Sequence, residues 1–353
     1  MKRVLIVGPN IGLGGVERAS CNLANALCSE QFDVRYLGLI PEPKFYSLNN
    51  KIRYIEPGNF NKKKLNFIKT LRYIRKEVFQ YDPTVIIVFT KFYAALTNLA
   101  LWMSSYKIIL TERSSPLYKW PLKIEFLCRF SFGFKSPSKV ISQTNIAASY
   151  HRKYYTKSKV KVIPNALRPI QQYPDLSRKN WILAVGRFHD DCKGFDRLIR
   201  AFNIIQNKTW RLVFAGGTQA EGQYLLKLTK DKTTASRIDF LGKVKDIDRI
   251  YAQSGVFVMP SRSEGFPNAL CEAMSAGCAC ISFDFIAGPK DIIKNSFDGV
   301  LVENGNINEL AQEIDNLILD EEKRLELGYN ARLISKRLSY ERVASQYIDY
   351  IFD

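Results

Sequence analysis

Histidine and paired cysteine, the usual protein ligands of zinc, are scarce in this sequence. Among its 353 residues there are two histidines, His151 and His189, and seven cysteines, no two of which form a C-x-x-C pair. A zinc site is therefore not expected. We expect the cysteines to be free, buried thiols in a protein of a reducing compartment.

Long uninterrupted apolar runs are also missing. The first apolar run ends at Gly8 with no cleavage site of small residues after it, which favours a first strand over a signal peptide. The nearest approach to a membrane span, residues 85–103, is interrupted by Thr90, Lys91 and Asn98. Since a span needs about 20 apolar residues, this stretch is predicted to be a buried strand followed by a helix.

Acidic residues are scarce in the first half of the chain only. The whole sequence has 52 lysines and arginines against 34 acidic residues, a net charge of +18. Residues 1–170 hold 28 basic and 9 acidic residues, a net charge of +19, whereas residues 171–353 hold 24 and 25. A half this basic indicates an anionic partner, which can be nucleic acid, a membrane surface or a phosphorylated substrate.

The remaining composition, 46% apolar and 24% charged, is that of a globular protein, and 353 residues favour two domains over one. Short runs rich in Val, Ile and Phe alternate with longer amphipathic segments, which is typical of parallel strands joined by helices. We therefore predict two doubly wound α/β domains. The expected strands are residues 3–7, 34–40, 85–89, 107–111, 139–142 and 160–163, then 182–185, 211–215, 238–240, 256–259 and 279–283.

A proline-flanked polar segment, residues 166–180, separates the two blocks of strands. It is predicted to be a hinge between a first domain, residues 1–165, and a second domain, residues 181–336. After about Asn306 only helical periodicity remains, and the expected helices are residues 308–319, 321–337 and 340–352.

The stretch from residue 256 to residue 277 carries the most chemical information. A buried strand leads into a polar loop with Glu264, and a helix is expected to begin at Pro267. The amides at that helix start, with the helix dipole, suit a diphosphate, while Glu272 on the same helix can reach a hydroxyl pair. An ordinary capped surface helix is the alternative. The amides expected at this anion site are those of Phe266, Asn268 and Ala269.

The two glutamates lie in S-R-x-E-G-F-P-N-A-L-x-E-A-M, which resembles the E-x7-E signature of the family-four retaining glycosyltransferases. The resemblance implies the GT-B fold: two Rossmann-like domains facing across a cleft, with the C-terminal helix, residues 337–353, returning to the first domain. It also implies transfer from a nucleotide-diphosphate sugar, by preference a UDP-sugar, without a metal. Residues 282–292 (SFDFIAGPKDI) are similar to a subgroup that acts on bacterial surface polysaccharides.

Two cations follow the first strand of the second domain, in a segment that resembles the family's G-R…K-G turn. Arg187 can fork onto phosphate oxygens, and Lys193 adds a point charge, a pairing suited to a leaving diphosphate. A solvated basic turn is the alternative.

Residues 12–18 (GLGGVER) resemble the family's first glycine-rich loop, where Gly14 and Gly15 would let backbone amides approach a phosphate or sugar. As a dinucleotide fingerprint the loop is weak, because the next strand ends without an acidic residue for a ribose, so no nicotinamide cofactor is expected. The resemblance places a base-binding loop at residues 240–244, and the further donor contacts it implies are Gly216, Val244 and Gly265.

Residues 111–116 (TERSSP) depart from the family, in which a histidine often follows this strand. Glu112 is expected to accept a hydrogen bond from a donor-sugar hydroxyl, and Arg113 to hold an acceptor phosphate. A structural ion pair among these two side chains and their neighbours is the alternative.

The remaining candidates are interpreted structurally. His189, near Arg187, and His151, on a basic helix, are expected on the surface. Residues 246–248 (DID) imitate a metal-binding D-x-D but begin a helix after a lysine, so N-terminal capping is expected.

In the basic half, cations are interleaved with aromatic residues, at residues 62–67 and 118–135. This mixture suits an anionic bilayer interface and a lipid-linked acceptor presented there, so we expect a cytoplasmic protein bound to the inner face of the plasma membrane. Nucleic acid is not expected as the partner, because no helix-turn-helix, RRM or finger signature is present.

The sequence thus predicts a glycosyltransferase that moves a sugar from a nucleotide-diphosphate donor to a glycan or polyprenyl-diphosphate-linked acceptor. No cofactor besides the donor is expected. A UDP-sugar epimerase and a catalytically silent nucleotide-sugar-binding partner remain open alternatives. The predicted catalytic residues are Glu264, Arg187, Lys193 and Glu112; the predicted donor contacts are Gly14, Gly15, Arg187, Lys193, Gly216, Val244, Gly265, Phe266, Asn268, Ala269 and Glu272.

Overall fold

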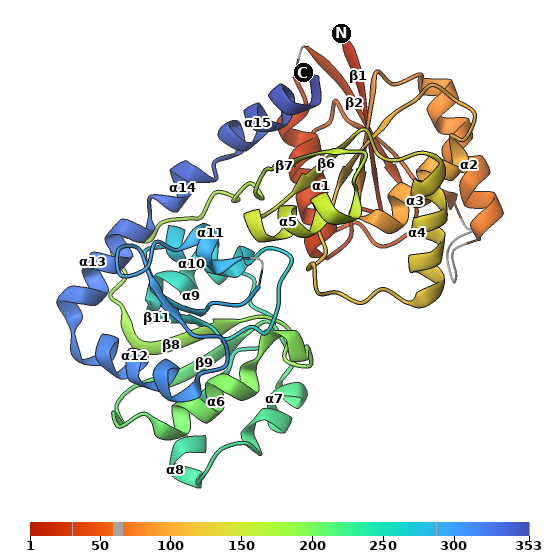
Figure 1. The fold of residues 1–353 in the computed structure, drawn as a ribbon. Coiled ribbons are helices and arrows are strands. Elements are labelled where there is room, and N and C mark those ends of the chain that lie inside the picture. The colour runs from red at the N-terminus through yellow and green to blue at the C-terminus, as the bar shows by residue number, and fades with distance from the viewer. Residues whose placement is uncertain (30, 59–65, 287, 353) are drawn as a thin grey trace. The chain divides into compact units, whose positions relative to one another are not determined.

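Two separate parallel sheets organise the chain (Figure 1). The structure is a computed structural model that describes residues 1–29, 31–58, 66–286 and 288–352. By its internal contacts the chain divides into an N-terminal unit, residues 1–166 together with 340–353, and a C-terminal unit, residues 167–339.

The described part of the N-terminal unit contains a seven-stranded parallel sheet in the order β3-β2-β1-β4-β5-β6-β7. Both faces are covered by helices, as the near-continuous apolar strands predicted. The strands are β1 (Lys2–Gly8), β2 (Phe32–Gly38), β3 (Arg53–Ile55), β4 (Val85–Phe89), β5 (Ile108–Thr111), β6 (Lys139–Ser142) and β7 (Lys159–Val162). The helices are α1 (Gly15–Leu27), α2 (Phe67–Tyr81), α3 (Lys91–Ala100), α4 (Leu122–Phe134), α5 (Asn145–Tyr154) and α15 (Tyr340–Phe352).

Successive residues of β1 enter two different hydrophobic cores. Val4 and Ile6 pack with residues of α1 and α15, whereas Leu5 and Val7 pack with residues of α2, α3 and α4. This alternation follows from the two-residue period of a strand, so each face of the sheet buries its own set of side chains.

Helix α15 belongs to the N-terminal unit although it follows the whole C-terminal unit in sequence. It contacts α1, and its buried residues Val343, Tyr347 and Ile351 join the core beneath that helix. The ring of Phe352 stacks on Phe32 with the ring centroids 5.1 Å apart.

The described part of the C-terminal unit contains a six-stranded parallel sheet in the order β10-β9-β8-β11-β12-β13. This is the doubly wound order, in which the chain starts in the middle and reverses direction between β8 and β11. The strands are β8 (Lys179–Val185), β9 (Arg211–Ala215), β10 (Ile238–Phe240), β11 (Ser254–Met259), β12 (Ala279–Phe283) and β13 (Val300–Val302). The helices are α6 (Phe195–Ile204), α7 (Gln219–Leu226), α8 (Lys232–Ala235), α9 (Ile247–Gln253), α10 (Asn268–Ser275), α11 (Pro289–Ile292), α12 (Ile307–Leu319), α13 (Glu321–Ala331) and α14 (Ile334–Arg337), with a short 3-10 turn η2 (Asp191–Lys193) before α6.

The structure differs from the prediction that residues 166–180 are a hinge between the two domains. From Leu167 onward it belongs to the C-terminal unit, and its last two residues begin β8. The amide of Gln171 donates to Asp248 at 2.9 Å, and the hydroxyl of Tyr173 donates to Asp246 at 2.6 Å. Gln171 and Tyr173 therefore bond to residues at the start of α9 and are not part of a solvated linker.

The stretch tested as a membrane span is strand β4 followed by α3, as predicted. Within the described residues, no helix combines the length and apolar character that crossing a bilayer requires. All seven cysteines are free, as expected; most are buried, and Cys192 is exposed. Burial raises the pKa of Cys21 and of Cys128 to about 12.

Candidate functional site

The candidate site of the C-terminal unit lies where the strand order reverses. In doubly wound sheets the loops after the two central strands diverge there and leave a crevice at the carboxyl ends of the strands. Here those strands are β8 and β11. Arg187 and Lys193 follow β8, and Glu264 follows β11, so three predicted site residues come to one edge of the sheet.

Lys193 and Glu264 form an ion pair at this edge. The Lys193 ammonium nitrogen lies 2.8 Å from Oε1 of Glu264, and the hydroxyl of Ser261 donates to the same oxygen at 2.9 Å. Both side chains are largely shielded, with 21% and 14% of their surface exposed. A cation held this way needs little rearrangement to meet an incoming phosphate, because its partner already fixes its position.

Two glycines let the backbone segments of this site approach one another. Gly194 has a φ of +65°, and a Cβ there would lie 2.1 Å from the carbonyl oxygen of Pro260. Gly216 has a φ of +116°, and a Cβ there would lie 2.7 Å from the carbonyl oxygen of Gly186. The turns after β8, β9 and β11 are therefore packed backbone to backbone, which side chains larger than hydrogen would prevent.

A guanidinium that sequence reasoning overlooked joins the two loops. Arg262 donates to both carboxylate oxygens of Asp196 at 2.7 Å, and its amide donates to the carbonyl oxygen of Cys192 at 2.8 Å. The hydrogen bonds from Arg262 lower the pKa of Asp196 below its usual value. The loop that carries Glu264 is thus fastened to the turn that carries Lys193. Arg262 is the arginine of the S-R-x-E signature, and this position in the motif could have indicated that it belongs to the site.

Arg187 lies at the outer border of the site. Its side chain is 69% exposed and donates to Asp190 at 2.7 Å. Asp190 also accepts a hydrogen bond from the amide of Cys192, which fixes the turn before Lys193. His189 is exposed, as expected, and its Nδ1 lies 2.7 Å from Glu221 at the start of α7.

The start of α10 differs from the expectation in one respect. The helix begins at Asn268, with Pro267 as the preceding cap residue, and the amide of Asn268 donates to the carbonyl oxygen of Phe266 at 2.9 Å. That amide was expected to point at an anion. The amides of Phe266 and Ala269 have no hydrogen-bond partner within the described ranges.

The other predicted donor contacts in this unit lie beside the site. Gly265 directly follows Glu264 in the loop, and the amide of Gly216 donates to the carbonyl oxygen of Gly242 at 2.8 Å. Val244 is half-buried and packs against the core. The loop predicted to bind the base therefore begins next to the glycine turn.

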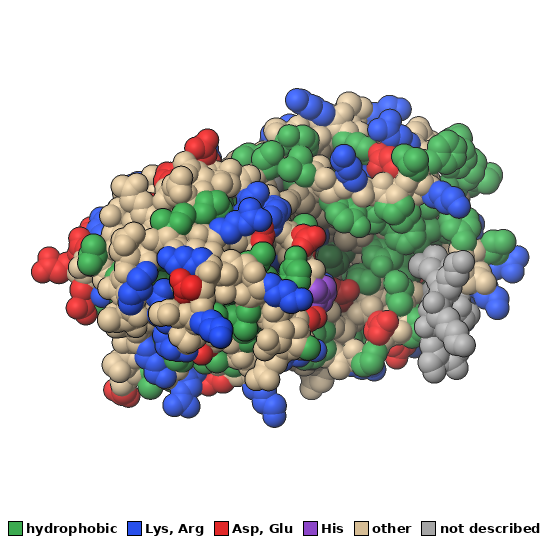
Figure 2. Space-filling model, turned by 90° about the horizontal axis from the view of Figure 1, so that it is seen from below, with side chains coloured by type: hydrophobic (Ala, Val, Ile, Leu, Met, Phe, Trp, Pro, Cys, Tyr) green, Lys and Arg blue, Asp and Glu red, His purple; other side chains and the backbone are tan. Residues whose placement is uncertain are grey.

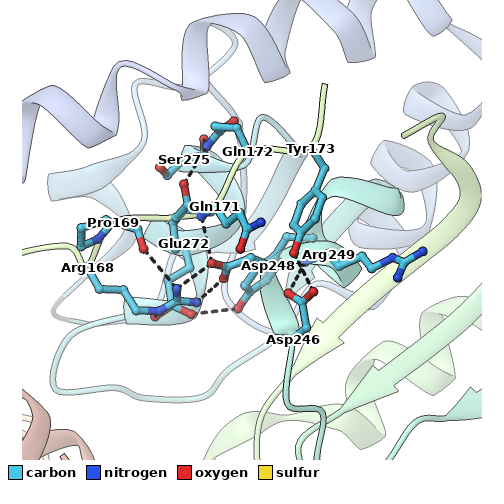
Figure 3. A network of polar contacts seen from close by, with 12 residues as sticks. Arg168, Pro169, Gln171, Gln172, Tyr173, Asp246, Asp248, Arg249, Glu272 and Ser275 are labelled. Atoms are coloured by element: carbon cyan, nitrogen blue, oxygen red, sulfur yellow. Dashed lines mark hydrogen bonds and ion pairs between the residues drawn. The ribbon is translucent and has the colours of Figure 1, made fainter. Parts of the chain in front are cut away.

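Glu272 is buried in a polar network that the sequence did not indicate (Figure 3). Arg168 donates through Nε to its Oε1 at 3.3 Å, and the hydroxyl of the buried Tyr251 donates to its Oε2 at 3.2 Å. Arg168 also binds both carboxylate oxygens of Asp248. Asp246 accepts a hydrogen bond from the amide of Arg249 and so caps α9, as predicted for the D-x-D imitation.

In the N-terminal unit the glycine-rich loop opens α1, and its helix start is already occupied by an acid. A Cβ on Gly14 would lie 2.0 Å from Oε2 of Glu17, whereas nothing lies within 4 Å of that position at Gly15. Burial raises the pKa of Glu17. A carboxylate at this place suits a ligand hydroxyl better than a phosphate.

Glu112 and Arg113 have protein partners in the interior of the N-terminal unit. Glu112 accepts hydrogen bonds from the amides of Arg113 and Ser114 at 3.0 and 3.1 Å. Arg113 donates to Thr111 at 2.7 Å and also to Asn165 and Tyr347. Both side chains are at least nine-tenths buried, so the geometry favours the structural alternative, in which Arg113 ties the loop after β5 to α15.

His151 lies in the interior and not on the surface, which corrects the prediction. It shares a hydrogen bond of 2.7 Å between its Nδ1 and the hydroxyl of Ser142, and burial lowers its pKa below 6.5. Ala147 and Ala148 lie on the same buried side of α5, and this apolar face sets the orientation of the helix despite its basic neighbours.

Comparisons with known proteins match each unit of the chain. The model of "Glycosyltransferase Family 4" matches residues 13–169, and the model of "Glycosyl transferases group 1" matches residues 169–334. An uncharacterised glycosyltransferase from Haemophilus influenzae is 28% identical over 98% of this chain and 99% of its own. A Campylobacter jejuni α-1,4-N-acetyl-D-galactosaminyltransferase, whose name gives a GalNAc-containing diphospho-undecaprenol as its substrate, is 26% identical over 99% and 98%.

Among solved structures, Anabaena Alr3699/HepE in complex with UDP superposes with a TM-score of 0.77 at 16% identity and covers 100% of both chains. At this identity the likeness shows the fold. With one glycosyltransferase model on each unit, together spanning residues 13–334, and relatives matched over 98% or more of their length, the chain is a GT4-like glycosyltransferase with the GT-B fold.

Proposed function

We propose that this protein is a retaining glycosyltransferase that takes a sugar from a UDP-sugar and adds it to a glycan or lipid-linked acceptor during the synthesis of a bacterial surface polysaccharide. The observation that carries the proposal is the Lys193–Glu264 pair at the point where the strand order reverses, bordered by Arg187 and the start of α10. UDP in the structural neighbour and the diphospho-undecaprenol glycan in the name of the Campylobacter relative support the two substrate classes.

The chemistry would be carried by charge and not by a metal. As the bond between the anomeric carbon and the leaving phosphate oxygen breaks, negative charge grows on the diphosphate. Lys193, Arg187 and the amides of Phe266, just before α10, and Ala269, in its first turn, would stabilise that charge in fixed positions. In front-face attack, the acceptor oxygen bonds to the anomeric carbon on the face from which the diphosphate leaves, so the anomeric configuration is retained. The departing phosphate oxygen takes the proton of the acceptor hydroxyl. Glu264 would accept hydrogen bonds from the sugar hydroxyls.

The donor proposal is tested by titrating the protein with UDP, GDP and CMP and then supplying UDP-sugars with lipid-linked and free glycan acceptors. Transfer with retained configuration, read by NMR of the new glycosidic bond, is the expected result. An epimerised UDP-sugar formed without any acceptor supports the epimerase alternative. UDP binding without turnover of any donor supports the silent binding partner.

We propose that the acceptor is presented at an anionic membrane surface and that the enzyme binds to this surface through α4. Four large apolar side chains at every fourth position of this helix, Leu122, Phe126, Phe130 and Phe134, are between 44% and 87% exposed. The opposite side of α4 is buried. Figure 2 shows hydrophobic side chains gathered on the face of the N-terminal unit, with lysines and arginines around them.

The exposed stripe of α4 is extended and flanked by the residue types that bilayer interfaces favour. Trp102 packs on Phe134 with ring centroids 5.0 Å apart, and the exposed cations Lys119, Lys123 and Arg129 lie along the stripe. The predicted basic cluster Lys62-Lys63-Lys64 lies outside the described residues. Because nucleotide sugars are cytoplasmic metabolites, we propose that the enzyme binds to the cytoplasmic face of the plasma membrane.

Replacing Phe126 and Phe130 by serine is expected to reduce flotation with anionic liposomes at least about fivefold, since each removes a ring worth about 2 kcal/mol on burial. The matched control is Leu325→Ser with Tyr329→Ser, an exposed apolar pair with the same spacing on α13. The membrane proposal is contradicted if the wild-type protein does not float with anionic liposomes at low salt. It is also contradicted if the α4 variant floats as well as the wild type.

A further inference from the structure

We propose that Arg168 is a positioning residue of the donor site, which holds the carboxylate of Glu272 in place for the ribose hydroxyl pair of the nucleotide. The inference rests on the proposed function, because it requires a nucleoside diphosphate at the start of α10. It concerns the side chain of the second residue of the C-terminal unit.

Arg168 is itself fixed before it reaches Glu272. Both of its terminal nitrogens donate to the carboxylate of Asp248, one of them at 2.9 Å, and this fork leaves Nε directed at Glu272 (Figure 3). Asp248 in turn accepts a hydrogen bond from the amide of Gln171 at 2.9 Å. The guanidinium is therefore oriented by α9, with its Nε directed at Glu272 on α10.

The charges of the network leave Glu272 a hydrogen-bond acceptor. One guanidinium faces two carboxylates, so Arg168, Asp248 and Glu272 together carry a net negative charge. The Glu272 side chain is only 7% exposed, and a buried carboxylate needs a hydrogen-bonding partner, which the Arg168 guanidinium supplies at 3.3 Å. Burial lowers the pKa of Arg168, but its hydrogen bonds to Asp248 and the charge of Glu272 outweigh burial and raise that pKa.

The position along α10 also fits a ribose. Glu272 lies four residues after Asn268, which is about 6 Å along the helix axis at about 1.5 Å per residue. That is the scale of the separation between a diphosphate and the ribose hydroxyls of the same nucleotide. A carboxylate that accepts from two adjacent hydroxyls must be held in one rotamer, and Arg168 and Tyr251 hold Glu272 from its two oxygens.

A purely structural role for the network makes a different prediction, so the readout is discrimination between nucleotides and not affinity alone. We expect wild-type protein to bind UDP about tenfold or more tightly than 2′,3′-dideoxy-UDP, since hydrogen bonds to a charged acceptor are lost with the hydroxyls. In Arg168→Gln this ratio should fall below about threefold, and Arg168→Lys should restore part of it. In a double variant with Glu272→Gln, no further loss of the ratio is expected.

The matched control is Arg178→Gln, which removes another largely buried guanidinium of the same unit. Arg178 donates to the carbonyl oxygens of Ala276 and Gly277 at 3.0 and 2.6 Å and does not contact Glu272. Its substitution can lower thermal stability but should keep the full nucleotide ratio. Thermal unfolding of each variant shows whether it is folded under the conditions of the titration.

Two outcomes separate this inference from the function on which it rests. If wild-type protein prefers UDP and Arg168→Gln keeps that preference in full, or binds UDP more tightly, Arg168 does not position Glu272 and only this inference is overturned. If the wild-type protein binds no nucleoside diphosphate, the proposed function fails and takes the inference with it.

Discussion

Replacement of Arg187 or of Lys193 by alanine is expected to lower the turnover number at least about a hundredfold, which is the usual cost of removing one fixed group that stabilises transition-state charge. Both cations would act on the leaving diphosphate. The measurement is the turnover number at saturating donor and acceptor, with thermal unfolding as the test of folding.

The two substitutions differ in what else they disturb, and the pair is therefore informative. Arg187 is mostly exposed, so its loss should leave the unfolding temperature nearly unchanged. Loss of Lys193 removes the cation beside the shielded Glu264, so the double variant Lys193→Ala with Glu264→Gln, which removes the unpaired charge, serves as the stability reference.

Lys323→Ala is the matched control, because it breaks an exposed lysine–glutamate pair of 3.1 Å elsewhere in the same unit. Its turnover should stay within about twofold of wild type, since surface pairs contribute little. Near-normal transfer by both site variants would mean that the diphosphate is stabilised by other groups, and the roles proposed for these cations would be withdrawn.

Replacement of Gly194 by alanine is expected to cost at least about 2 kcal/mol of unfolding free energy and to abolish most of the activity. The positive φ alone costs about 1–2 kcal/mol for a residue with a Cβ. The new methyl group would also collide with the carbonyl oxygen of Pro260, 2.1 Å away, which lies in the backbone and cannot swing aside. The collision separates the turn of Lys193 from the loop of Glu264.

Gly133→Ala provides the comparison for this prediction. Gly133 lies in α4, and nothing within 4 Å meets a Cβ there, so alanine should be neutral or stabilise the protein by about 0.5–1 kcal/mol. Urea unfolding followed by circular dichroism measures both variants. An unfolding free energy of Gly194→Ala equal to that of wild type would show that the close approach of the two loops is not required.

The positions of most strands along the chain, and the turns that bring Arg187, Lys193 and Glu264 to one edge of a sheet, could be predicted because both depend on local pattern. Apolar runs fixed β4, β6, β9, β10 and β12 to the residue. The strand, loop and helix around Glu264 were identified from a spacing that is itself contained in 22 residues. Where local propensity and the tertiary structure agree, a single sequence is sufficient evidence.

Several elements could not be predicted, each for a physical reason. Strands β3 and β13 have three residues each and were not predicted, although β10, which is equally short, was. The longest of the three C-terminal helices predicted, residues 321–337, is divided into α13 and α14, although no proline marks the break. These differences arise from packing against neighbouring elements, which the sequence does not display locally.

The networks around Arg168 and His151 depend on residues far apart in the chain. Arg168 contacts a carboxylate 80 residues away and another 104 residues away, and it lies in a segment whose prolines and polar residues indicated a linker. His151 is followed by the basic residues Arg152 and Lys153, which indicated a solvated face, but its side chain faces Ser142 and Tyr155. Long-range pairing of this kind is visible only once the fold is known.

The return of α15 to the N-terminal unit has a consequence for how the protein is made. During synthesis, residues 1–166 emerge first, but the core beneath α1 lacks Val343, Tyr347 and Ile351 until all of the C-terminal unit has followed. The hydrogen bond from Arg113 to the hydroxyl of Tyr347 likewise cannot form until α15 has been synthesised. The first unit to leave the ribosome is therefore the last to be completed. The apolar surface that α15 will cover stays exposed on the nascent chain while the C-terminal unit folds.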